Sequence, residues 1–219
     1  IWENIAPNLV YPVPFMVPTY KQAKSGKMML MMGMWLYDML SYDKKRTWDP
    51  AKKLPNHTPL SRKQVLELEP YIKPEKLNGG VVYYDCQNIF PERATLSFIK
   101  SAAYYGADVA NYAEVTGFTR NAEGAVNGIH LTDRLNGSTH SLKGRMVVNG
   151  AGTWADRVLK LAQHSRGSHA MKRSEGIHLV VPKMNGKHAV AINTPEGRHV
   201  MIMPWRGYSL IGTTDQPYQ

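Results

Sequence analysis

The sequence predicts an α/β fold with α+β character. A helix expected over residues 92–105 is followed by Gly106 and by strand formers at 109–112, which is the helix–glycine–strand order of an α/β layer. Short strand candidates separated by hairpin signals extend over residues 115–148, and further strands and turns begin beyond Ser174. We therefore expect a partial α/β layer with an inserted antiparallel meander, together with a second antiparallel sheet.

Composition and charge narrow the function classes. The 27 Lys and Arg against 17 Asp and Glu give a net charge of +10, which favours an anionic partner such as nucleic acid, an acidic membrane face or a phosphorylated small molecule. Basic and aromatic residues do not interleave, so we expect no nucleic acid partner. The single cysteine, Cys86, excludes an internal disulfide and a thiolate cluster, so we expect no metal site and a reducing, cytoplasmic compartment.

The first 70 residues contain a proline-rich beginning and a basic, Met-rich helical segment expected over 21–46. Residues 1–20 are predicted to form short extended pieces broken by prolines, as expected if the natural chain begins further upstream. Ser61 is a plausible N-cap for a short helix over 62–69, and Pro70 is its expected stop.

Two interpretations of the Met-rich helix stay open. Its apolar run, Met28 to Leu40, is shorter than the roughly 20 residues of a bilayer span, so we expect no transmembrane helix. Methionine fills irregular gaps, which favours a buried core helix. Lysines flank the run on both sides, which is also typical of a helix that enters the lipid interface while its cations meet anionic headgroups.

A small-residue turn is the first candidate ligand site. An expected buried strand at 146–149 runs into Gly150-Ala151-Gly152-Thr153-Trp154, and a helix is predicted over 155–163. A strand, a turn of small residues and a helix let a flat or phosphorylated ligand approach the backbone. Tight packing would give the same pattern, because the full Gly-x-Gly-x-x-Gly spacing is absent.

Four further residues could carry chemistry. His178 lies on a predicted strand, Ile177 to Val181, where most histidines are structural; facing a cavity, an imidazole suits proton abstraction from an alcohol. Arg198 and Arg206 follow turns, where arginines are either solvated or able to bind phosphate through paired N–H groups. Thr213 opens an expected capped turn.

The match to one known family rests on six segments spread over nearly the whole chain. In order, these are Asn8-Leu9-Val10 with Pro14, Gly33-x-Trp35-Leu36-Tyr37-Asp38, Gly79-Gly80-x-x-Tyr83-Tyr84-Asp85, Val147-Val148-Asn149-x-x-Gly152-x-Trp154-Ala155-Asp156, Gly176-Ile177-His178-Leu179-Val180-Val181-Pro182, and Pro204-Trp205-Arg206-Gly207 leading to Ile211-Gly212-Thr213-Thr214-Asp215. Together they resemble the FAD-dependent glycerol-3-phosphate dehydrogenases, within the D-amino-acid-oxidase-like flavoprotein superfamily.

The resemblance implies a set of site residues. In that family the small-residue turn lies beside FAD, and a backbone position matching Val115 meets the adenine. The expected cofactor-binding residues are therefore Val115, Asn149, Gly150, Ala151, Gly152 and Trp154. His178 matches the favoured catalytic base, and the expected substrate-binding residues are Arg198, Arg206 and Thr213.

The implied reaction is oxidation of sn-glycerol 3-phosphate to dihydroxyacetone phosphate, with electrons passing through FAD in the full-length parent to a quinone or to oxygen. Two alternatives stay open: a related FAD-dependent oxidoreductase acting on another hydroxy or amino acid, and a non-catalytic module that binds a membrane surface. The expected location is cytoplasmic, with a peripheral position on the inner face of the cytoplasmic membrane as an alternative. An unpaired sheet edge would also favour a homo-oligomer.

The resemblance also divides the chain. Residues 1–70 hold the segments described above, 71–88 a strand of a substrate cap, 89–170 part of the FAD-binding domain and 171–219 a substrate-binding antiparallel sheet. The family usually reads Asn-Ala-Thr-Gly-Pro-Trp where Asn149 to Trp154 stand, so three of those residues differ. No Gly-x-Gly-x-x-Gly and no C-terminal flavin loop are present, and we expect a truncated domain that binds FAD poorly and is inactive alone.

Overall fold

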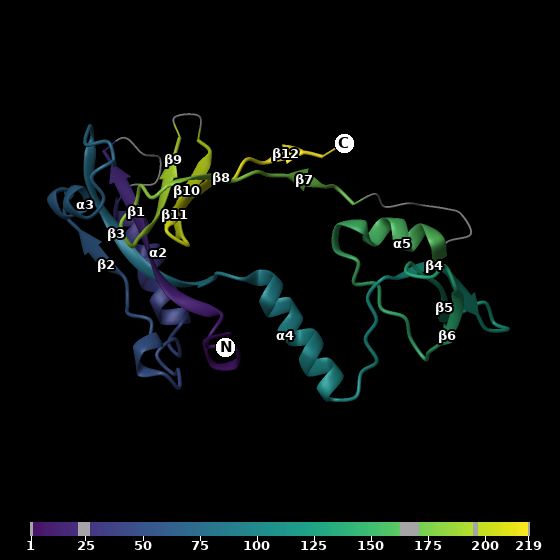
Figure 1. Ribbon diagram of the computed structural model, residues 1–219. Helices are drawn as coiled ribbons and strands as arrows, with labels where there is room; N and C mark the ends of the chain where they lie inside the picture. The colour runs from purple at the N-terminus through teal and green to yellow at the C-terminus, as the bar shows by residue number, and fades with distance from the viewer. Residues whose placement is uncertain (1, 22–26, 163–170, 195–196, 219) are drawn as a thin grey trace. The chain divides into compact units, whose positions relative to one another are not determined.

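The computed structural model describes residues 2–21, 27–162, 171–194 and 197–218 (Figure 1). The chain forms two compact units. The first contains Ile1–Phe98 and Gly176–Asp215, and the second contains Ile99–Glu175 and Gln216–Gln219. Both units combine helices with strands, which agrees with the predicted α/β fold with α+β character.

A seven-stranded mixed sheet organises the first unit (Figure 1), in the order β2-β3-β1-β9-β10-β11-β8. Its strands are β1 (Val10–Tyr20), β2 (Thr58–Leu60), β3 (Leu77–Asn88), β8 (Leu179–Pro182), β9 (Ala189–Asn193), β10 (His199–Trp205) and β11 (Tyr208–Gly212). Neighbouring strands are antiparallel except β1 and β9, which are parallel and pair only at Phe15 with Ala189 and at Met16 with Val190. The predicted C-terminal antiparallel strands are thus half of one larger sheet.

The proline-rich beginning forms a central strand, and the prediction of short broken pieces was wrong. A short helix, α1 (Trp2–Ile5), precedes β1, which runs unbroken for 11 residues and pairs with β3 along its length. Pro12, Pro14 and Pro18 are separated by even numbers of residues along β1, so their missing N–H groups point to the same side of the strand. We infer that this is the β9 side, where only two residues pair and few donors are needed.

The core of the first unit lies between the sheet and α3 (Arg62–Leu68). Val65 of α3 packs with Met16, Val82 and Val190 from β1, β3 and β9, and all four side chains are buried. The predicted N-cap is confirmed: the Ser61 hydroxyl accepts a hydrogen bond from the Gln64 backbone N–H, and the Gln64 side chain accepts one from the Ser61 N–H. The helix ends at Leu68, one residue earlier than predicted, and Pro70 follows its C-cap Glu69.

A buried polar junction ties the end of α3 to the loop between β8 and β9. Glu69 is fully buried, and its two carboxylate oxygens contact His188 Nδ1 at 2.7 Å and the Gly186 N–H at 2.9 Å. Asn185, in the same loop, donates to the His188 carbonyl and accepts from the Ser209 hydroxyl of β11. Because the side chains of Glu69, Asn185, His188 and Ser209 are all buried, the junction joins the N-terminal and C-terminal parts of this unit in one geometry.

The Met-rich helix α2 (Lys27–Leu40) contains no buried residue, so the interpretation as a buried core helix was wrong. It is shorter than predicted, and residues 22–26 lie outside the described residues. Tyr37 anchors it through a hydrogen bond to the Tyr84 carbonyl, and Asp38 accepts hydrogen bonds from Lys44 and His57. Burial alone would raise the pKa of Asp38, but these hydrogen bonds outweigh it and lower that pKa.

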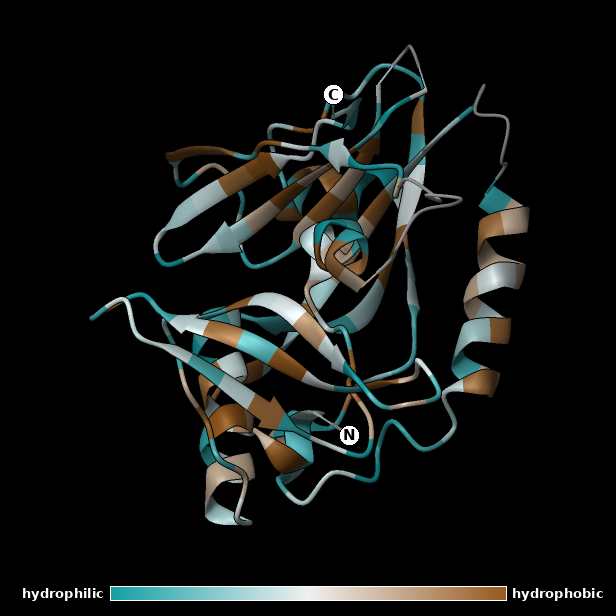
Figure 2. Cartoon of the chain, turned by 90° about the vertical axis from the view of Figure 1, so that its right-hand side faces the viewer, coloured by the Kyte–Doolittle hydropathy of each residue, from teal (hydrophilic) through white to brown (hydrophobic). Residues whose placement is uncertain are grey.

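Apolar residues recur along the helices as well as within the sheets (Figure 2). On α2 the exposed apolar side chains are Met28, Met29, Met32, Trp35, Leu36, Met39 and Leu40. Within the described parts of the chain, no helix is both long and apolar enough to span a bilayer. A single 3-10 turn, η1 (Pro50–Lys52), follows α2.

The second unit contains the predicted meander. α4 (Pro91–Tyr104) leads into it from the first unit, and β4 (Ala113–Arg120), β5 (Val126–Asp133) and β6 (Thr139–Lys143) form an antiparallel three-stranded sheet. η2 (Gly152–Trp154) and α5 (Ala155–Ala162) follow, and β7 (Ser174–Glu175) pairs with β12 (Gln216–Pro217). Gly124 and Gly137 occupy the two turns of the meander with φ of 81° and 79°, so the predicted hairpin signals are confirmed.

Two predicted strands of the second unit do not form. Residues 109–112 and 146–149 belong to no strand, and Val109, Tyr112, Met146 and Val148 are exposed. A strand needs hydrogen-bonded neighbours along its length, and no described strand pairs with either segment. One backbone bond, from the Arg134 N–H to the Tyr112 carbonyl, does not extend into a ladder. Moreover, none of the apolar side chains in the described part of this unit is buried.

Replacing Glu69 tests the buried junction. Glu69→Ala removes the partner of the buried His188 side chain and of the Gly186 N–H, and we expect it to lower the free energy of unfolding by about 3–5 kcal/mol. Glu67→Ala on the same helix is the matched control, because Glu67 is exposed and lies 3.8 Å from Lys63; its expected cost is below about 1 kcal/mol. Urea unfolding measures both, and equal costs would contradict the assigned role.

Candidate functional site

Three predicted site residues lie at one end of the mixed sheet. Leu179 of β8 pairs with Ile211 of β11, so His178 lies opposite Gly212, with Thr213 next to it. Gly212 also pairs with Met201 of β10, and Arg198 precedes that strand on the same side. The strand register therefore brings His178, Thr213 and Arg198 to a common end of the sheet.

The His178 side chain is exposed and lies against the backbone of β11. A Cβ added at Gly212 would stand 2.5 Å from His178 Cδ2, so the ring covers the glycine. Within the described ranges no group hydrogen-bonds this imidazole. An exposed ring without an internal partner is available to exchange a proton with a ligand.

Arg198 closes the hairpin between β9 and β10. The Thr194 N–H donates to the Arg198 carbonyl at 2.8 Å, and the Thr194 hydroxyl accepts from the Arg198 N–H at 3.3 Å. These bonds hold the backbone of Arg198, while its guanidinium forms no ion pair with any described residue. The side chain is therefore a cation available to an anionic ligand.

Arg206 stands at the opposite end of β10, in the turn before β11. Eight residues of strand separate it from Arg198, which corresponds to roughly 25 Å. Its guanidinium lies over the rings of Phe90 and Trp205, and Glu92 is 3.9 Å away. The sheet therefore does not place Arg206, a predicted substrate-binding residue, at the end that carries His178.

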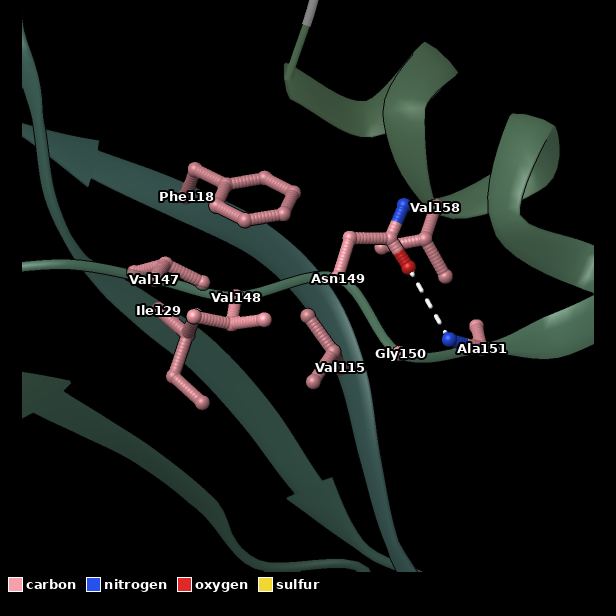
Figure 3. A pocket seen from close by; sticks show the side chains of 9 residues that line it. All are labelled: Val115, Phe118, Ile129, Val147, Val148, Asn149, Gly150, Ala151 and Val158. Carbon is pink, nitrogen blue, oxygen red and sulfur yellow. Dashed lines mark hydrogen bonds between the residues drawn. The ribbon is translucent and has the colours of Figure 1, made fainter. Parts of the chain in front are cut away.

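A second candidate site is an apolar hollow of about 210 Å³ in the second unit. Four of the six predicted cofactor-binding residues line it: Val115, Asn149, Gly150 and Ala151. Figure 3 shows that Phe118 comes from the meander and Val158 from α5, so the hollow lies between the meander and the segment leading into that helix. The other lining residues are Ile129, Val147 and Val148.

Asn149 shapes the bend at the edge of this hollow. Its carboxamide oxygen accepts from the Ala151 N–H at 3.2 Å (Figure 3), and its amide nitrogen donates to the Ala155 carbonyl at 2.8 Å. The remaining predicted cofactor residues, Gly152 and Trp154, form η2 beside it; Gly152 has a φ of +54° and Trp154 is exposed. The bend thus presents backbone and a free indole next to the hollow.

Sequence reasoning missed several lining residues. Phe118 and Ile129 are paired across β4 and β5, so their side chains lie on the same face of the meander. Strand alternation from Val115 was a usable signal, but a bulge between Val115 and Gly117 changes the facing of the residues that follow. Val158 could only be placed once α5 was known to pack over the bend.

Other reactive groups do not form a site. Burial raises the pKa of the Cys86 thiol to about 11, and the nearby carboxylates of Glu3 and Asp85 contribute, so the thiol is protonated near neutral pH and is a poor nucleophile. In the part of the chain that the structure describes, no three His, Cys, Asp or Glu side chains gather as metal ligands would.

Known proteins similar to this chain fall in one class. Aerobic glycerol-3-phosphate dehydrogenases from Staphylococcus epidermidis and Staphylococcus aureus are 31% and 32% identical over 221 residues, covering 100% of this chain and 38% of each relative. A glycerol-3-phosphate dehydrogenase from Bacillus halodurans, solved in complex with FAD, is 30% identical with a TM-score of 0.75 and is matched over 100% of this chain and 37% of its own. The chain thus spans less than two-fifths of these relatives.

The fold extends to a more distant structure. The L-alpha-glycerophosphate oxidase of Mycoplasma pneumoniae with FAD bound is 19% identical, with a TM-score of 0.66 over 96% of this chain and 51% of that one. The shared fold is that of an oxidoreductase domain of the flavoprotein type. A family model described as FAD dependent oxidoreductase matches residues 2–219, and the chain belongs to that family.

Proposed function

We propose that this chain is part of an FAD-dependent dehydrogenase that oxidises sn-glycerol 3-phosphate to dihydroxyacetone phosphate. The observation that carries the proposal is the common end of the mixed sheet, where His178, Thr213 and Arg198 meet. An exposed imidazole, a hydroxyl and an unpaired cation suit a small phosphorylated alcohol. The named relatives are glycerol-3-phosphate dehydrogenases, which supports this choice over another hydroxy or amino acid.

The residues of the second unit suit part of FAD. A ligand pocket for a whole cofactor usually exceeds about 300 Å³, so the hollow of about 210 Å³ suits one ring of the cofactor. Val115 and Phe118 would pack on that ring, while the bend at Gly150 to Gly152 has open space at both glycine Cα atoms for close approach. Asn149 and Trp154 would border the same cofactor.

Each protein group has a defined role in the proposed reaction. FAD, when bound, would supply the acceptor for the hydride that leaves the alcohol carbon of the substrate. His178 takes the hydroxyl proton as the C–H bond breaks, so the alcohol becomes a ketone and the imidazole becomes positively charged. Arg198 neutralises the phosphate and orients the alcohol. The Thr213 hydroxyl donates to the Thr214 carbonyl, so its oxygen offers the substrate an acceptor. Electrons then pass to a quinone or to oxygen.

Replacing the proposed base and the proposed phosphate ligand tests this function in the protein produced at the length of its relatives. His178→Ala is expected to lower kcat about 10²–10⁴-fold, because the base acts on the reacting hydroxyl. Arg198→Gln is expected to raise KM for glycerol 3-phosphate about tenfold or more through loss of a charged hydrogen bond. Stopped-flow reduction of the flavin measures both effects.

Two comparisons sharpen this test. Arg206→Gln, at the opposite end of β10, shows whether the second predicted arginine also binds phosphate. The KM for an unphosphorylated alcohol should be unchanged in Arg198→Gln. Full activity of His178→Ala on glycerol 3-phosphate, or a preference for an amino acid, would refute the proposed reaction.

The 219-residue chain alone is proposed to bind FAD poorly and to be inactive. Residues 109–112 and 146–149 have no strand partners within the described residues, and the sequence contains no Gly-x-Gly-x-x-Gly turn to hold a pyrophosphate. We expect the purified chain to show less than about one-tenth of stoichiometric flavin absorbance near 450 nm after incubation with micromolar FAD. A stoichiometric flavin spectrum would contradict this expectation.

A peripheral membrane contact through α2 is a second candidate function. Met28, Met32, Trp35 and Met39 are spaced three or four residues apart, so they share one helix face, and all four are exposed. Exposed cations lie beyond both helix ends, at Lys21 and Lys45. Anionic lipid would meet both features, with the apolar face in the interface and the cations on the headgroups.

Vesicle binding by the protein at the length of its relatives tests the lipid contact. The double variant Met32→Glu with Trp35→Glu is expected to weaken co-sedimentation with phosphatidylglycerol vesicles about tenfold or more, because two apolar side chains no longer enter the interface. Leu135→Glu is the matched control, since Leu135 is equally exposed but lies outside α2. Unchanged binding of the double variant would mean that another surface meets lipid or that protein covers α2.

A further inference from the structure

Two glycines lie where the segment before β8 crosses the end of β11. A Cβ added at Gly176 would overlap the Thr213 hydroxyl oxygen and the Thr214 carbonyl. A Cβ added at Gly212 would lie 2.5 Å from Cδ2 and 2.9 Å from Cγ of His178. Each segment therefore has a glycine whose missing Cβ leaves room for atoms of the other segment.

Hydrogen bonds fix the crossing on both sides of Ile177. The Ile177 N–H donates to the Thr214 hydroxyl at 3.0 Å, and the Thr214 N–H donates to the Ile177 carbonyl at 3.4 Å. These bonds hold the residue preceding His178 against the residues that follow Gly212. Because this backbone is held, the His178 imidazole lies against β11 at Gly212.

Space, and not a positive φ, is what the structure shows to favour glycine at 212. Neither Gly176 nor Gly212 has a φ in the left-handed region, where glycine would be preferred whatever the space. A useful contrast is Gly117 of the meander, which also lies opposite a histidine across an antiparallel pair. A Cβ at Gly117 would lie 3.5 Å from the His130 ring, an ordinary contact.

We propose that Gly212 is a positioning residue for His178: the absence of a Cβ seats the imidazole flat against β11 at the candidate substrate site. A methyl group at 212 would displace the imidazole away from β11. The His178 side chain can rotate, whereas its backbone is held by the hydrogen bonds between Ile177 and Thr214. The inference rests on the proposed function, in which the same imidazole receives the substrate proton. Its consequence is that Gly212 controls proton transfer without touching the substrate.

The test uses the flavin-loaded protein at the length of its relatives. Gly212→Ala is expected to lower kcat at least about tenfold while KM for glycerol 3-phosphate changes little, because proton transfer depends steeply on the position of the base. The His178 resonance in a histidine-labelled NMR spectrum should shift. Gly117→Ala is the matched control, and it should leave kcat, flavin content and the His178 resonance unchanged.

A double-mutant cycle separates positioning from general damage. In a His178→Ala background the added methyl group meets no ring, so Gly212→Ala should cost no further activity. An equal loss in both backgrounds, or an unshifted His178 resonance with full kcat, would overturn the proposal. If Gly212→Ala does not fold, recovery of folding in the double variant supports the proposed contact, and failure of both overturns it.

The outcomes also distinguish this inference from the proposed function. Should His178→Ala keep full kcat, the base assignment fails, and the His178 resonance in Gly212→Ala alone decides whether the glycine seats the ring. Should His178→Ala lose activity while Gly212→Ala keeps both kcat and the resonance, the base assignment stands and the positioning role is refuted.

Discussion

The buried contact of Glu69 with His188 and Gly186 is the constraint on which the first unit depends. β1 and β9 are hydrogen-bonded at only two positions, so backbone pairing alone joins the N-terminal strands weakly to the C-terminal ones. The carboxylate of Glu69 reinforces this join from the end of α3, and its full burial makes the loss of either partner costly. Asn185 and Ser209 extend the same network to β11.

The buried junction helps to fix the geometry of the candidate site. The loop that Glu69 holds leads back to β8, and β8 pairs with β11, so the register at Leu179 and Ile211 is fixed from within the unit. His178, Gly212 and Thr213 lie at the far end of this pairing. A proton acceptor must be held within a fraction of an ångström, and a rigid sheet end provides that more readily than a free loop.

Local signals in the sequence predicted much of this structure. The N-cap at Ser61 and the glycine turns of the meander act over a few residues, and each is present. The central position of β1 could not be predicted, because it depends on pairing with β3 some 60 residues later in the chain. The burial of Glu69 could not be predicted either, because a glutamate next to a proline resembles an ordinary exposed helix end. His178 was identified through a family motif, whereas the close approach of its ring to Gly212 is seen only in the structure.

The two wrong strand predictions in the second unit share a physical cause. Residues 109–112 and 146–149 have strand-forming composition, yet strand sequences are stabilised by neighbours and not by their own backbone preference. The absence of buried apolar side chains in the described part of this unit fits the same explanation, because a layer without its partner layer has no interior. The glycerol-3-phosphate dehydrogenases named above are each more than twice as long as this chain. The strand-forming composition of residues 109–112 and 146–149 therefore signals a preference for pairing that the described residues do not satisfy.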